Sequence, residues 1–246
     1  MAGSVIDLER FQMDRGQKFH RHMHDEHQLV WASSGVLMVD VDERYWVLPS
    51  TLALWIPAGV WHGSMALRDS VMEGIYLEPS QTTVAWSEPT IVAVSPLASH
   101  LIHYLAEEME PSARTHAENV LLNVLKPANK AAIELRQPRD NRARDIADLL
   151  TANPADKRGI EELARVVGSS PRTLLRLFVA ETGMTFAQWR LHARLQAAMG
   201  FLAEGHSVAG AAYRVGYANP SAFVAAFHRS TGHTPAAYFG GDQLSL

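Results

Sequence analysis

SVAGAAYRVGYANPSAFVAAFHRSTGHTPAAYF, at residues 207–239, decides the fold of the second half of the chain. Its first apolar residues recur at positions i, i+3, i+4 and i+7 and end at Gly216, so they predict a short helix with one apolar face. Asn219 then offers an N-cap oxygen and Pro220 a preset φ angle, which predicts the start of a second helix. Two short helices joined by a tight turn form a helix-turn-helix.

The same pattern occurs once more upstream. The cap, the proline and the apolar face are repeated at residues 168–190, in the segment GSSPRTLLRLFVAETGMTFAQWR. Phe178 corresponds to Phe227 and Trp189 to Tyr238, both at an offset of 49 residues. An ordinary helical bundle would explain the helices but not a duplicated turn, so we interpret the segment as a tandem repeat.

Both copies closely resemble the DNA-binding domain of the AraC/XylS family of bacterial transcription regulators. The resemblance in the second copy is carried by residues 215–239, VGYANPSAFVAAFHRSTGHTPAAYF. The resemblance covers residues 141–239. It implies an all-α domain whose two helix-turn-helix motifs bind double-stranded DNA. Phe239 departs from the family, which usually carries a basic residue there, so one phosphate contact of the family is not expected here.

Composition and charge limit the remaining possibilities. The chain of 246 residues is 47% hydrophobic and 20% charged, which is typical of a soluble protein with two cores. It has no cysteine, which excludes disulfides and thiolate metal sites and fits a cytoplasmic location. We expect no membrane contact, because no stretch approaches the roughly 18 apolar residues of a span.

The net charge of −4 is unevenly distributed. Residues 1–139 contain 11 basic and 17 acidic residues, whereas residues 140–246 contain 11 basic and 9 acidic residues. The acidity therefore belongs to the first part of the chain. The small positive excess of the second part predicts that DNA affinity depends on locally placed arginines and helix N-termini.

Residues 17–78 change to the period of β-strands. The pattern resembles the cupin sensor domain that precedes the DNA-binding domain in many AraC-type regulators: His22-x-His24 with Gln28 is similar to the first cupin motif, and PAGVWH, at residues 57–62, to the second. The predicted fold is thus α+β in two domains, with an antiparallel β-barrel or jelly roll before the helical domain. The expected strands are 28–31, 36–41, 45–48, 52–56 and 71–77.

The histidines of the two motifs suggest a ligand site. In metal-binding cupins two histidines, an acid and a later histidine converge, and His22, His24 and His62 stand at the matching positions. Gln28 replaces the acid, and an amide is a poor ligand for Zn²⁺ or Fe²⁺. A divalent metal at the three histidines and an organic small-molecule effector therefore both stay open. The candidate effector-binding residues are His22, His24, Gln28, Trp55 and His62.

Residues 91–137 are expected to be helical again. The resemblance favours a helix pair that forms a homodimer, and packing within one chain is the alternative. The domains are then a sensor at 1–95, a dimerisation and linker segment at 96–137, and a DNA-binding domain at 138–246. The apolar faces consist of Leu97, Leu101, Tyr104, Leu105 and Met109 and of Val120, Leu121, Val124 and Leu125.

The second helix of each motif carries the expected DNA contacts. A helix of about 20 residues at 185–204 would span about 30 Å and place two recognition helices in successive major grooves. Arg172 and Arg176 can bind guanine, whereas the second helix offers few base-reading donors. The candidates are Ser169, Ser170, Arg172, Thr173 and Arg176 in the first motif, and Asn219, Ser221, Val224, Ala225 and Arg229 in the second.

The sequence therefore predicts a DNA-binding transcription regulator that responds to an effector and is not an enzyme. RNA polymerase is a further candidate partner. The alternative is a metal-dependent cupin enzyme fused to a degenerate helical domain. It is disfavoured because Gln28 replaces the acid and because both helix-turn-helix copies keep their caps and turns.

Overall fold

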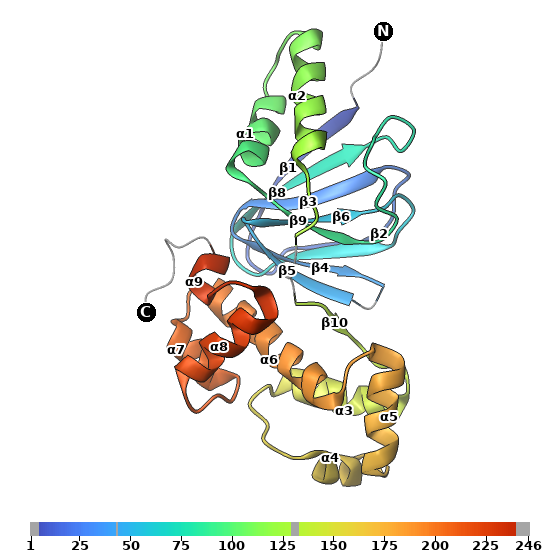
Figure 1. Ribbon diagram of the computed structural model, residues 1–246, viewed down its shortest axis with the longest axis vertical. Helices are drawn as coiled ribbons and strands as arrows, with labels where there is room; N and C mark the ends of the chain where they lie inside the picture. Colours follow the sequence, from blue (N-terminus) through green and yellow to red (C-terminus); the bar gives the residue numbers. More distant parts are fainter. Residues whose placement is uncertain (1–4, 43, 129–132, 240–246) are drawn as a thin grey trace. The chain divides into compact units, whose positions relative to one another are not determined.

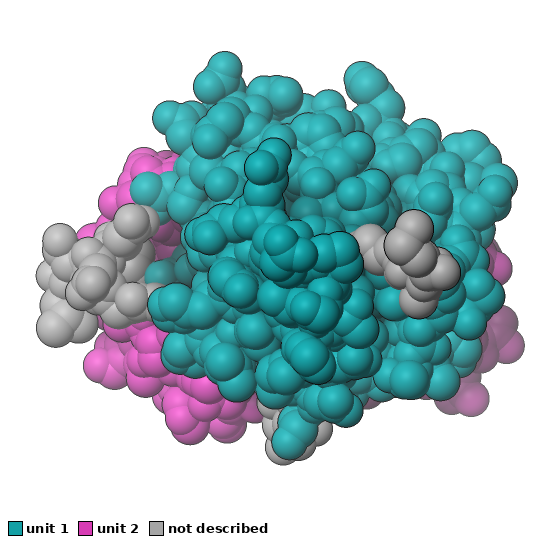
Figure 2. Space-filling view, turned by 90° about the horizontal axis from the view of Figure 1, so that it is seen from above, with its two compact units in different colours: residues 1–42, 48–132, 238–240 teal, residues 43–47, 133–237, 241–246 magenta. Residues whose placement is uncertain are grey.

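The computed structural model describes residues 5–42, 44–128 and 133–239 (Figure 1). The chain divides into two compact units, coloured separately in Figure 2. The first unit holds residues 5–42, 48–128 and 238–239 of the described chain, and the second unit holds residues 44–47 and 133–237. Among the described helices, none is long and apolar enough to cross a membrane.

Two antiparallel five-stranded sheets form the jelly roll that the sequence predicts, which confirms the α+β fold class. Every strand expected from the sequence lies within an observed one, and β1, β2, β7, β9 and β10 were missed. The first sheet has the order β1 (Ile6–Met13), β8 (Ser70–Leu77), β3 (His27–Ser34), β6 (Leu52–Ile56), β9 (Thr90–Ala93). The second has the order β10 (Leu135–Arg136), β5 (Arg44–Pro49), β4 (Val36–Val41), β7 (His62–Ala66), β2 (Lys18–His22).

The central strands of the first sheet are buried on both faces. Strand β3 is buried from Gln28 to Ala32, and successive side chains of a strand point to opposite faces. One face carries Leu29, Trp31 and neighbouring apolar residues, and two helices cover it, α1 (Pro96–Leu105) and α2 (Pro111–Val124) (Figure 1). Gln28 therefore points to the other face, toward the inside of the jelly roll.

The helix pair α1 and α2 buries only part of its predicted apolar faces. The predicted apolar face of α1 is divided: Leu97 is 52% and Tyr104 44% exposed, whereas Leu105 is buried in the core and Leu101 and Met109 pack against it. Leu121 is fully buried against the sheet, so it belongs to the core of its own chain. Residues 90–93 form strand β9 and not a helix. Periodicity showed that apolar faces exist, but the apolar sheet beneath the helices decides which face is buried.

The second unit contains the duplicated motif. Helices α4 and α5 form its first copy, α7 and α8 its second, and α6 lies between them in the chain. Ser170 and Asn219 accept N-cap hydrogen bonds, as the sequence predicts, and Gly183 and Gly232 end the recognition helices in the left-handed conformation. The helices are α3 (Asn141–Ala152), α4 (Ile160–Val166), α5 (Pro171–Thr182), α6 (Phe186–Ala203), α7 (Val208–Arg214), α8 (Pro220–Thr231) and α9 (Pro235–Tyr238).

Candidate ligand pocket and nucleic-acid interface

Three histidines, His22, His24 and His62, converge in the first unit, and we call them the histidine cluster. His22 ends β2 and pairs with His62 at the start of β7, and His24 lies in the following loop. The ring centroids are 4.4 Å apart for His22 and His62, and 5.1 Å apart for His24 and His62. One ligand nitrogen of each histidine lies within 4.8 Å of the others. The structure therefore brings together the three residues that the sequence nominated.

Backbone carbonyls set the tautomer of these rings. The Nδ1 atom of His22 lies 2.7 Å from the carbonyl oxygen of His20, that of His24 lies 2.8 Å from Glu26 O, and that of His62 lies 2.9 Å from Val60 O. A carbonyl oxygen only accepts hydrogen bonds, so we assign the ring hydrogen to Nδ1 in each neutral imidazole. Each Nε2 then carries a lone pair that can bind a cation.

His62 is the most buried member of the cluster, with a residue exposure of 2%. Burial lowers the pKa of His62 to about 4, and the nearby His22 and His24 lower it further while the hydrogen bond to Val60 opposes the shift. The imidazole is therefore neutral at physiological pH. Its Nε2 atom is buried and has no hydrogen-bond partner in the described part of the chain. An unsatisfied buried polar atom costs about 1–3 kcal/mol, which points to a ligand at this position.

Gln28 and Tyr76 continue the polar lining. Gln28 is buried, and its Oε1 lies 3.2 Å from His24 Nε2. With the ring hydrogen on Nδ1, both of these atoms are acceptors. A rotation of the amide by 180° places its nitrogen there instead, and this nitrogen donates a hydrogen bond to His24 Nε2. The Tyr76 ring lies 5.3 Å from that of His24. Burial, the dominant cause, and the charge of Glu9 raise the pKa of Tyr76 to about 12, so its hydroxyl keeps its hydrogen.

Trp55 does not join this lining. It pairs with Leu29 across strands β3 and β6 and lies in the core beneath the two helices, on the face opposite to Gln28. Its Nε1 donates to Trp86 O at 3.0 Å, and its ring packs 4.9 Å from that of His27. The expectation that Trp55 contacts the effector is therefore corrected. Sequence spacing alone could not tell the two faces of β6 apart, because all five of its residues are buried.

A cavity of about 460 Å³ opens beside His22, His24 and Tyr76. Among the described residues, no lysine or arginine lines it. Sequence reasoning missed its acidic side chains, because most come from strand β1 and the end of β8, which only the sheet pairing brings beside the cluster. The carboxylates, which we call the acidic mouth, are Asp7, Glu9, Glu26 and Glu78.

The first recognition helix, α5, presents Arg172 and Arg176 to solvent. Among the described residues, neither arginine has a hydrogen-bond or ion-pair partner, so both can bind another molecule. Ser170 Oγ accepts from the backbone N–H of Thr173 at 3.1 Å and therefore caps the helix. The half-buried Ser169 precedes it, and its Oγ has no partner in the described part of the chain.

The second recognition helix, α8, has a different surface. Asn219 Oδ1 accepts from the N–H of Ser221 at 2.8 Å, so Asn219 serves as a cap. Ser221, Val224, Ala225 and neighbouring residues of α7 and α8 line an open groove of about 620 Å³. The groove is mostly apolar, with Arg229 at its edge. It offers methyl groups more than hydrogen-bond donors, as the sequence predicts.

These features define a regulator with a ligand-binding domain and a DNA-binding domain in one chain. Residues 9–125 match the family described as AraC-like ligand binding domain, and residues 163–240 match the family described as helix-turn-helix domain. The chain belongs to the AraC family of helix-turn-helix transcription regulators.

Two relatives, NimR and RipA, agree with this assignment. The chain is 30% identical over 222 residues to the HTH-type transcriptional regulator NimR of Escherichia coli, covering 88% of this chain and 81% of NimR. It is 40% identical over 105 residues to the HTH-type transcriptional regulator RipA of Corynebacterium glutamicum, covering 43% of this chain and 32% of RipA. A crystal structure of ToxT from Vibrio cholerae covers 96% of this chain and 98% of the ToxT chain, with 10% identity and a TM-score of 0.40. NimR and RipA are regulators, so the expectation that the chain is not an enzyme is confirmed.

Proposed function

We propose that this regulator acts in the cytoplasm, reads DNA with both recognition helices, and is controlled by a divalent cation bound at the histidine cluster. The observation that carries the cation proposal is the buried, unpartnered Nε2 atom of His62 in the described part of the chain. It lies in a cluster whose other two histidines also direct Nδ1 to backbone carbonyls.

Three features favour a transition metal such as Zn²⁺. Neutral imidazole nitrogens suit Zn²⁺, Fe²⁺ and similar ions, and three of them suffice for a site that keeps an open position. The carbonyl partners of the Nδ1–H groups correspond to the outer hydrogen bonds that orient metal-binding histidines. The acidic mouth attracts cations and disfavours anionic effectors.

Metal binding by the purified protein tests the cation proposal. After treatment with a chelator, the full chain should bind one equivalent of Zn²⁺ in a calorimetric titration, and a variant carrying His24→Ala and His62→Ala should not. His20→Ala is the matched control, because His20 is exposed and lies on β2, the strand that ends at His22. A parent that binds no Zn²⁺, Fe²⁺ or Mn²⁺, or a double variant that binds as the parent does, would exclude the metal and leave an organic effector.

The DNA proposal rests on Arg172 and Arg176, which face solvent on α5. A duplex selected from a random library by the protein would supply the specific site. Arg176→Ala should weaken binding to this duplex by about 1–3 kcal/mol and relax preference at one base pair, because a bidentate contact to guanine is lost. Equal weakening on selected and random duplexes would show that Arg176 contacts only phosphate.

We also propose that the protein is a homodimer through the exposed side of the helix pair. Leu97 and Tyr104 of α1 and Val120 of α2 are large hydrophobic side chains that remain exposed in the single chain. A dimer would bury them and bring four recognition helices to one operator, which raises the apparent affinity. RNA polymerase stays a predicted partner without assigned residues.

A further inference from the structure

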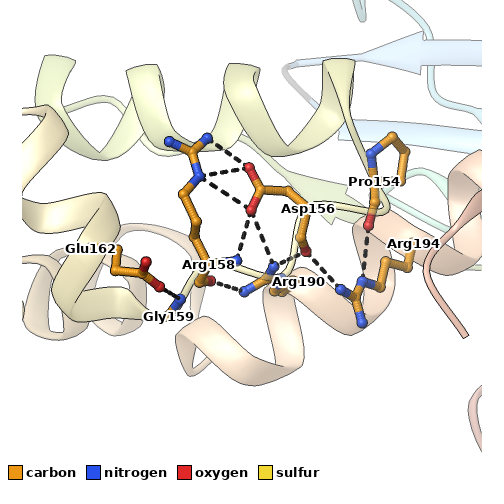
Figure 3. A network of polar contacts seen from close by, with 7 residues as sticks. All are labelled: Pro154, Asp156, Arg158, Gly159, Glu162, Arg190 and Arg194. Atoms are coloured by element: carbon orange, nitrogen blue, oxygen red, sulfur yellow. Dashed lines mark hydrogen bonds and ion pairs between the residues drawn. The ribbon is translucent and has the colours of Figure 1, made fainter.

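The carboxylate of Asp156 lies at the centre of a polar network in the second unit (Figure 3). Asp156 belongs to the loop between α3 and α4 and is largely buried. Its Oδ2 accepts hydrogen bonds from Arg158 Nε at 2.9 Å and Nη2 at 2.6 Å, and Arg190 Nη2 lies 3.9 Å from Oδ1. Hydrogen bonds from Arg158 are the main reason that the pKa of Asp156 lies below its usual value. The carboxylate is therefore charged at neutral pH.

Two arginines of helix α6 hold the backbone of the same loop (Figure 3). Arg190 donates to the carbonyl oxygen of Arg158 at 2.6 Å and to that of Asp156. Arg194, one turn further along α6, donates to Pro154 O at 3.0 Å and to Asp156 O at 2.9 Å. Hydrogen bonds from charged donors are stronger than neutral ones, so the loop is fixed firmly to α6.

The loop also meets the turn of the second helix-turn-helix. Gly216, in that turn, has a φ angle of +86°, and a Cβ atom there would lie 3.0 Å from Ala155 Cα and 3.4 Å from Arg194 Nη2. Burial raises the pKa of the neighbouring Tyr217, and the charge of Arg194 opposes the shift. Arg194 therefore lies where the loop that leads into the first motif approaches the turn of the second.

We infer that Asp156, Arg158, Arg190 and Arg194 are positioning residues that fix the distance and angle between the two recognition helices. This inference rests on the proposed reading of DNA by both helices. A rigid link holds the second helix at one position along the duplex when the first is bound, which raises its effective concentration there and lowers it elsewhere. The network thus sets the base-pair spacing between the two contacted segments of the operator.

The experiment measures spacing tolerance. A duplex that the full chain selects from a random library is remade with one base pair inserted or deleted between its two contacted segments. One base pair turns the second segment by about 34–36° about the DNA axis. In fluorescence anisotropy the parent should lose about tenfold or more in affinity at the altered spacings. Arg194→Gln should bind the selected duplex more weakly but lose only about threefold or less on changing the spacing.

Arg158→Ala is a milder variant of the same kind, because it removes only the side chain that orients the Asp156 carboxylate. This variant still tests the inference if Arg194→Gln does not fold, which loss of the parent's helical circular dichroism signal would show. The matched control is Arg142→Ala. Arg142 forms an ion pair with Asp140, two residues before it, through Nη2 at 2.8 Å. This pair caps α3 and forms no hydrogen bond or ion pair with a described residue of α6.

A flattened spacing profile in Arg194→Gln or Arg158→Ala, with a parental profile in Arg142→Ala, would support the inference. A loss by the same factor at every spacing, or an unchanged profile, would overturn it and leave the reading of DNA by both helices intact. A parent that selects duplexes with a single contacted segment would instead overturn the proposed reading of DNA, and the inference with it.

Discussion

Replacing His62 with asparagine should make the first unit less sensitive to acid. The pKa of His62 is 6.5 when the side chain is solvated and about 4 in the folded protein. Between these values the unfolded chain binds a proton that the folded protein does not, so stability falls as the pH drops. With 1.36 kcal/mol per pKa unit, the loss grows from nearly zero above pH 7 to about 2 kcal/mol at pH 5 and about 3 kcal/mol at pH 4.

The asparagine variant should lack this loss. Its side-chain nitrogen can replace Nδ1 as donor to Val60 O, and it does not titrate. Urea unfolding with a chelator present, followed by tryptophan fluorescence, would compare the free energy of unfolding at pH 7.5 and pH 5. Trp31, Trp55 and Trp86 belong to the first unit and report its transition.

The parent should lose about 2 kcal/mol more than His62→Asn between the two pH values. His20→Asn, which changes an exposed histidine, should behave as the parent. Equal losses in the parent and in His62→Asn would refute the argument that burial keeps this imidazole neutral. The proposed metal site would then lose its best-defined ligand.

Three further perturbations test other parts of the protein. Gln28→Glu should tighten Zn²⁺ binding in competition with a chelator dye, because a carboxylate is a better ligand than an amide; unchanged affinity would place Gln28 outside the coordination sphere. Leu97→Glu should be a monomer in light scattering and should keep the thermal stability of the parent. Leu121→Glu should unfold the first unit, because the substitution buries a charge. A parent that is monomeric at tens of micromolar would remove the dimer proposal. Trp189→Phe should destabilise the second unit by about 1 kcal/mol in thermal unfolding, because the hydrogen bond from Nε1 to Arg136 O is lost; an unchanged midpoint would show that water replaces it.

The second unit could be predicted from the sequence because its signals are local. Ser170 and Asn219 each act within three residues of their own position, as caps of the helices that follow them. Gly183 and Gly232 end the same helices in a conformation that glycine adopts readily. The duplication then adds evidence, since one copy supports the interpretation of the other.

The first unit could be predicted only in outline because its decisive contacts are distant in the chain. Strand β1 pairs with β8 over its whole length, which brings Glu9 near Tyr76, and no local pattern records this pairing. Trp55 was grouped with the histidines for the same reason, although it lies on the opposite face of the sheet from Gln28. For Leu121 a dimer contact and packing within one chain both stayed open, because periodicity defines an apolar face without showing what covers it.

The arrangement of charge in the pocket bears on how a cation could act as a signal. The three imidazoles and the amide of Gln28 supply no negative charge next to a bound ion, whereas the acidic mouth supplies it from the surrounding wall. Such a site attracts the ion but holds it less tightly than one with a coordinating carboxylate. A regulator must release its ligand when the concentration falls, and an effector shifts DNA binding only through its different affinity for two states of the protein. On the proposed function, glutamine at position 28 therefore suits a sensor, whereas glutamate would suit a permanently bound metal.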